Sequence, residues 1–307
     1  MPRLTRSPRG AASRRIGFTL IELLVTLALL GVVGTIVSRM MLDQQRFYQQ
    51  TNEQMGLRRE LRTAMSMLPA DLRSLSSVGG DIKDFDATSL TFQTTTGAGV
   101  ICDKPNNTTI DLPPTDMART TLHSWYTEPL VGDTLYAFRS DSMGAGGDSW
   151  AAHRITAISK DASYCPGSPY TDAALDAGKL RWRFTVTPAI ADSVKVGAAV
   201  RFTRTTKYSL TQGVSGKWYI GRAEYAGGAW GAATAIAGPF LAPGSGGINF
   251  AMFDSTGAAV AVGGNAKSIS RIDLTLKGQG ASSSGKVAGV QTPRDSMVFR
   301  IALRNRQ

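Results

Sequence analysis

Cysteine and histidine are scarce in this sequence, which has two of each in 307 residues. The cysteines are Cys102 and Cys165, and the histidines are His123 and His153. Because structural zinc takes four closely spaced ligands, we expect no metal site from two cysteines and two histidines that are far apart in sequence. The P-loop, HExxH and nucleophile patterns of common enzymes are also missing. The sequence therefore favours a structural or binding protein over an enzyme, and we expect no cofactor.

Acidic residues are absent from the first 17 positions, which carry five arginines. The net charge of +11 falls to +6 beyond them, which is mild for so long a chain. A basic run directly before an apolar stretch is typical of a cytoplasmic flank under the positive-inside rule. We therefore interpret these arginines as topological signals and not as a nucleic-acid site.

The apolar stretch is the twenty residues from Phe18 to Val37, in which Glu22 is the one charged residue. At about 1.5 Å per residue a helix of this length crosses a hydrocarbon core of about 30 Å. A carboxylate in such a span costs a few kcal/mol unless it is paired or neutralised, so Glu22 predicts a function with a cationic partner. A cleaved secretory signal has its small residues after the apolar region, whereas here Gly17 precedes it.

The stretch RRIGFTLIELLV, residues 14–25, resembles the prepilin leader shared by type IV pilins and the pseudopilins of type II secretion. The resemblance implies that a prepilin peptidase cuts between Gly17 and Phe18 and methylates the new amino group of Phe18. Glu22 then becomes the fifth residue of the mature chain, where such proteins keep a glutamate. We predict that Glu22 pairs with the Phe18 amino group, in its own chain or on a neighbouring subunit, and so sets register during assembly.

Polar helix formers dominate from Ser38 onward and predict a helix that continues the span. An apolar stripe at helical spacing follows: Leu57, Leu61, Met65, Leu68, Leu72 and Leu75. We expect this stripe to cover a β-sheet of the same chain and not to form a coiled-coil seam, because a globular domain follows. Residues 38–56 lack the stripe and either link membrane to domain or pack on other subunits. Pro69 is expected to kink or divide the helix.

Short alternating runs between turn residues predict strands beyond residue 79. They lie at 89–96, 134–140, 153–159, 180–186, 199–210, 217–225, 248–257, 269–278 and 296–306. The expected fold is α+β, a long N-terminal helix packed on a mainly antiparallel β-rich domain. The predicted segments are a leader (1–17), a span (18–38), an amphipathic helix (39–78) and the β-rich domain (79–307). Residues 269–304 resemble the closing hairpin of PilW and GspJ-like minor pilins, and the order of runs through the body is similar to the PilW type.

Three groups of side chains in the β-rich domain leave alternatives open. In a periplasmic domain we expect Cys102 to pair with Cys165, the alternative being two separately buried thiols. The acidic residues of GGDIKDFD are expected to form a turn and not a calcium site. The aromatic residues form either a ligand surface or internal packing, and we expect packing: Trp125, Tyr126, Trp150, Trp182, Trp218, Tyr219 and Trp230.

The resemblance implies a minor type IV pilin of the PilW kind, made as a prepilin in the inner membrane. Its single span leaves the N-terminus cytoplasmic and the β-rich domain periplasmic until it enters the pilus, near the tip, and reaches the cell surface. The implied partners are the prepilin peptidase, other minor and major pilins, the inner-membrane assembly platform and a tip adhesin. Nucleic acid is not expected. The alternatives are a GspJ-like type II secretion pseudopilin, disfavoured by the chain's length, and an adhesive or DNA-binding minor pilin.

Overall fold

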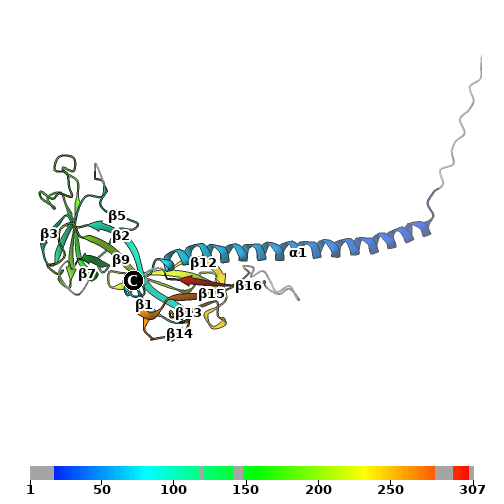
Figure 1. Cartoon of the computed structure of the whole chain (residues 1–307). Helices are drawn as coiled ribbons and strands as arrows, with labels where there is room; N and C mark the ends of the chain where they lie inside the picture. Colours follow the sequence, from blue (N-terminus) through cyan, green and yellow to red (C-terminus); the bar gives the residue numbers. More distant parts are fainter. Residues whose placement is uncertain (1–16, 118–120, 141–147, 281–292, 304–307) are drawn as a thin grey trace, which may run out of the picture. The chain divides into compact units, whose positions relative to one another are not determined.

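The computed structural model describes residues 17–117, 121–140, 148–280 and 293–303, so most of the leader and the last four residues lie outside it (Figure 1). One long helix, α1 (Leu20–Arg73), precedes a mainly antiparallel β-domain, which confirms the α+β prediction. The chain divides into two compact units, residues up to Asn52 and residues from Glu53 onward. The helix contributes to both.

The strands of the described residues are β1 (Ile82–Phe85), β2 (Ser89–Val100), β3 (Asp103–Asn106), β4 (Thr109–Leu112), β5 (Ser124–Trp125), β6 (Thr134–Arg139), β7 (Ser149–Asp161), β8 (Arg181–Thr187), β9 (Ala199–Gln212), β10 (Trp218–Ala226), β11 (Ala229–Trp230), β12 (Thr234–Phe240), β13 (Ile248–Phe253), β14 (Ala259–Val260), β15 (Arg271–Gln279) and β16 (Arg294–Ala302). Two 3-10 turns, η1 (Pro243–Ser245) and η2 (Ala266–Ser268), join the later strands. Every predicted run overlaps one of these strands.

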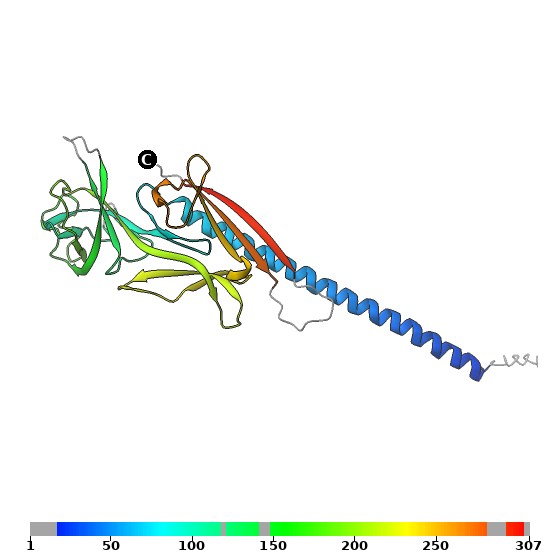
Figure 2. The ribbon, with the colours of Figure 1, turned by 90° about the horizontal axis from the view of Figure 1, so that it is seen from below.

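The C-terminal part of α1 covers a face of the sheet, as the apolar stripe predicts. Four leucines of the stripe on the helix and Leu75, just past its end at Arg73, are buried, and Met65 is partly buried, all packed with strands from β1 to β16. A Cβ atom on Gly278 of β15 would lie 2.2 Å from Leu57, so only glycine allows the helix this close. Figure 2 shows β15 and β16, in orange and red, beside this part of the helix. Each buried leucine contributes about 2 kcal/mol, which explains why the helix packs here.

The helix continues through Pro69 to Arg73, so the prediction that Pro69 divides it is wrong. A proline inside a helix removes one backbone hydrogen bond. Here that loss falls in the last turns of the helix, and Leu68, Pro69 and Leu72 are all buried against the sheet. Burial of this apolar face outweighs the missing hydrogen bond.

A single sheet links two separate hydrophobic cores. Its main path runs β14-β13-β15-β12-β10-β9-β6-β7-β8-β4-β3, with the other strands paired at its sides. The long strands β2 and β9 pair from Ser89 with Ser209 to Val100 with Ala199. Of the two, β9 contributes residues to both cores. Leu90 lies in the core under α1, whereas Phe202 lies in the second core. The described residues between β2 and β9, which are 101–117, 121–140 and 148–198, therefore form a lobe inserted between these strands, which we call the inserted lobe.

A buried ion pair joins the inserted lobe to the rest of the sheet. Arg204 of β9 donates two hydrogen bonds to Asp133, at 3.0 and 2.9 Å, and one to Glu224 of β10, at 2.9 Å. Arg204 is 4% exposed and Asp133 1%. Burial by itself would lower the pKa of Arg204, but the hydrogen bonds to Asp133 and Glu224 outweigh it and raise that pKa. The charge is thus permanent and fully paired.

Candidate processing and assembly site

The first turn of α1 is closed by a reciprocal pair of side chains. The Thr19 backbone N–H donates to the Glu22 carboxylate at 3.1 Å, and the Glu22 N–H donates to the Thr19 hydroxyl at 3.3 Å. This arrangement is a capping box, which satisfies backbone donors that a helix N-terminus otherwise leaves unpaired. The T-x-x-E spacing makes the cap recognisable from sequence, yet our sequence analysis assigned Glu22 only to assembly. The carboxylate therefore has a structural partner before any leader is removed.

The peptide bond between Gly17 and Phe18 is uncovered. A Cβ atom built on Gly17 would meet no described atom within 4 Å, and the Phe18 side chain is 83% exposed. Cutting this bond would create an amino group one residue before the cap residue Thr19. That amino group would lie four residues before Glu22 in sequence, about one helical turn from its carboxylate.

The apolar side chains of α1 that follow Glu22 are not buried by other described residues of the N-terminal unit, which ends at Asn52. From Leu23 to Val37 every large apolar side chain is exposed by about half or more of its surface. This part of α1 is long and apolar enough to cross a membrane, and none of it is buried. An exposed apolar surface of this size needs lipid or other helices around it.

Trp125 and Trp182 of the inserted lobe pack internally, as expected, whereas Tyr126 is 86% exposed and Trp230 of β11 is 45% exposed, against the expectation of packing. The Trp125 ring lies edge-on to those of Trp182, at 5.7 Å, and Phe202, at 4.8 Å. His123 lies 4.9 Å from Trp125, and its burial lowers its pKa to about 4, so it is neutral at pH 7. Trp150 differs, because half of its surface is exposed.

The acidic residues predicted to form a turn before β2 instead flank strand β1, with Asp84 inside it, and Asp81 and Asp86 have structural partners. Asp81 is buried, accepts a hydrogen bond from Ser76 N–H at 2.9 Å and pairs with Arg201 at 3.0 Å. Asp86 accepts the backbone N–H groups of Thr88 and Ser89, at 2.6 and 2.7 Å. Burial would raise the pKa of Asp86, but hydrogen bonds from the hydroxyl and backbone N–H groups of Ser89 and Thr88 outweigh it and lower that pKa. Within the described ranges, no three histidine, cysteine or acidic side chains gather in a way that fits a metal ion.

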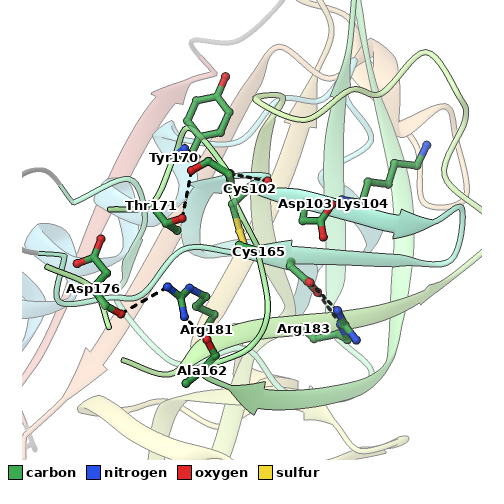
Figure 3. The surroundings of a disulfide bond; sticks show 12 residues. Cys102, Asp103, Lys104, Ala162, Cys165, Tyr170, Thr171, Asp176, Arg181 and Arg183 are labelled. Atoms are coloured by element: carbon green, nitrogen blue, oxygen red, sulfur yellow. Dashed lines mark hydrogen bonds and ion pairs between the residues drawn. A yellow bond between two sulfur atoms is a disulfide. The ribbon is translucent and has the colours of Figure 1, made fainter. Parts of the chain in front are cut away.

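Cys102 and Cys165 are joined by a disulfide inside the inserted lobe, with Cα atoms 5.6 Å apart (Figure 3). The bridge ties the start of the lobe to the long connection between β7 and β8. The Ser168 hydroxyl donates to the Cys102 carbonyl at 2.7 Å, and the Arg181 guanidinium donates to the carbonyls of Ala162 and Asp176. The same connection is thus held at several points.

We expect a protein with both cysteines replaced by alanine to lose about 4 kcal/mol of unfolding free energy in the chain-entropy account, because the bridge closes a loop with a sequence separation of 63. Urea unfolding of the full chain in detergent measures this loss. Alkylation followed by mass spectrometry, without reductant, checks the bridge itself. If both thiols of the native protein take the label, the pairing is refuted.

The comparisons with known proteins agree with this site. Residues 12–38 match the family model described as the prokaryotic N-terminal methylation motif. No curated protein and no solved structure matches the chain. The motif supports a type IV pilin-like protein, and it implies processing by a prepilin peptidase and assembly with other pilins. It points to a structural role and agrees with a membrane-anchored chain.

Proposed function

We propose that the protein is a minor type IV pilin of the PilW kind, made as a prepilin and incorporated into the pilus at or near its tip. A prepilin peptidase cuts between Gly17 and Phe18 and methylates the Phe18 amino group. Residues 18–38 anchor the chain in the inner membrane, with the N-terminus cytoplasmic and residues 79–307 periplasmic. The same helix then enters the filament. Its partners are other minor and major pilins, the assembly platform and a tip adhesin.

One observation carries the proposal. The methylation motif sits on an apolar helix whose span is entirely uncovered, with an open Gly17–Phe18 bond at its start. A helix of this kind is stable in lipid before assembly and among similar helices afterward, because both environments bury its apolar surface. The Glu22 carboxylate marks the register, since it is costly in an apolar environment until a cation neutralises it.

N-terminal sequencing of the chain recovered from sheared filaments tests the proposal. We expect a mature protein that begins with N-methylated Phe18. A control with Gly17 replaced by glutamate should keep the leader and stay in the membrane fraction, because a bulky charged side chain would occupy the open space beside the bond. A native chain that retained residues 1–17 while supporting normal pili would refute the function.

Deletion of the gene separates the proposal from the type II secretion alternative. A minor pilin is required for surface pili, and its loss should leave protein secretion unchanged. Loss of a pseudopilin should instead stop protein secretion and leave surface pili normal. Loss of secretion with normal pili would assign the chain to the secretion system and would leave the processing site untouched.

A further inference from the structure

A groove on the β-domain lies between the end of the β15–β16 hairpin and the connection from β12 to β13. Its lining is made by Leu241, Ser245, Lys277, Gly278, Arg294, Ser296 and one acid, Asp295. A neighbouring hollow shares Leu241, Ser245 and Arg294 and adds aromatic side chains, including Trp218 and Phe240. The groove thus combines cations, hydroxyl groups and an apolar wall.

The floor of the groove is fixed by backbone hydrogen bonds. Leu241 N–H donates to the Lys277 carbonyl and Lys277 N–H donates to the Gly247 carbonyl, each at 3.0 Å. The chain after β12 is therefore tied to β15 at this point, on the side opposite β16. The Lys277 ammonium lies close to Gly246, 3.5 Å from where a Cβ atom would stand. Backbone hydrogen bonds of the sheet therefore fix the position of the groove floor.

Lys277 and Arg294 are unpaired cations on the same face of the hairpin. Lys277 is opposite Ser296, and Arg294 is opposite Gln279, so the two cations are diagonal neighbours. Such neighbours have Cβ atoms about 7–8 Å apart, where like charges repel. Among the described residues neither has a carboxylate within ion-pair distance.

Asp295, the acid next to Arg294 in sequence, is already paired with a cation of α1. The two carboxylate oxygens of Asp295 accept hydrogen bonds from Arg58 Nε, at 3.2 Å, and from Ser296 N–H, at 2.9 Å. Asp295 is therefore paired with Arg58 of α1 and does not neutralise Lys277 or Arg294. An exposed pair of like charges beside an apolar wall fits an anionic ligand that also has apolar atoms.

We propose that this groove binds an acidic segment of a neighbouring pilin-type subunit, through carboxylates held by Lys277 and Arg294. The proposal rests on the assembly function above. Charge distribution supports the occupant, because residues 200–307 contain 13 lysines and arginines but only 4 acidic residues. A partner surface that approaches this part of the chain must supply the negative charge. The groove also adjoins the part of α1 that Leu57 and Arg58 anchor to the hairpin.

Binding of a hexaglutamate peptide to the full chain in detergent tests the groove, with hexaglutamine as the neutral control. We expect hexaglutamate to bind about tenfold more tightly, and the double variant Lys277→Gln/Arg294→Gln to lose this preference. The matched variant Lys267→Gln/Arg300→Gln removes the same charge elsewhere and should bind as the native chain does. Equal binding of both peptides, or a groove variant that keeps the preference, would overturn the proposal.

Two further measurements distinguish this proposal from nucleic-acid binding at the groove and from a failure of the proposed function. If a single-stranded oligonucleotide binds more tightly than hexaglutamate through the same two residues, the ligand is nucleic acid and the proposal fails. In cells, we expect the groove variant to be cleaved after Gly17 but recovered in sheared filaments at a lower level than the matched variant. Failure of cleavage in the native chain would refute the proposed function, whereas normal cleavage and normal recovery of the variant would refute only the groove.

Discussion

Glu22→Ala chains are expected to be cut after Gly17 as efficiently as the native chain but to enter filaments about tenfold less, since a loss of about 1.4 kcal/mol changes an equilibrium tenfold. The substitution removes the carboxylate that would pair with the Phe18 amino group. N-terminal sequencing measures cleavage, and immunoblotting of sheared filaments measures incorporation. The two readouts separate processing from assembly.

The capping box supplies the control. A glutamine at position 22 can still accept the Thr19 N–H and preserve the cap, because Gln serves at this helix position as Glu does. It carries no charge. If Glu22 acts through an ion pair, Glu22→Gln should fail to assemble as Glu22→Ala does. If Glu22→Gln filaments match the native ones, the carboxylate serves only to cap the helix and the register hypothesis is wrong.

Arg204→Met should lower the unfolding free energy by about 3–5 kcal/mol, because it leaves the buried Asp133 carboxylate without its cation. Methionine retains much of the apolar stem, so the loss reports the missing charge and hydrogen bonds. The carboxylate of Glu224 loses the same partner. Urea unfolding of the full chain in detergent, followed by tryptophan fluorescence, measures the change.

Lys160→Gln is the matched control for this prediction. Lys160 forms an ion pair with Glu128 at 3.5 Å, but both side chains are well exposed. Exposed pairs contribute less than about 1 kcal/mol. The Lys160 ammonium also lies 3.6 Å from the centroid of the Trp182 ring, a contact of about 0.5–1 kcal/mol at an exposed site, so this substitution should lower the unfolding free energy clearly less than Arg204→Met does. An Arg204→Met chain as stable as Lys160→Gln would show that the buried pair does not hold the inserted lobe to the sheet.

Sequence patterns identified most of the longer strands and missed the shortest ones and β12. β13 and β15 alternate fully buried residues with half-buried or exposed ones and were predicted. All four residues of β4 are buried, including Asp111, which pairs with Arg183 at 2.7 Å. An acid in a fully buried strand gives no periodic signal, and its partner lies 72 residues away. β12 was missed because glycine and proline interrupt it.

The N-terminal motif and the apolar span could be predicted from sequence, because the residues that define them are adjacent in the chain. Gly17, Phe18 and Glu22 lie within one short motif, and the leucine stripe of α1 repeats at helical spacing. The inserted lobe, its attachment through Arg204 and the groove that Lys277 and Arg294 share could not be predicted in this way. These features bring together residues far apart in sequence, and strand pairing, which local patterns do not specify, determines which of them meet.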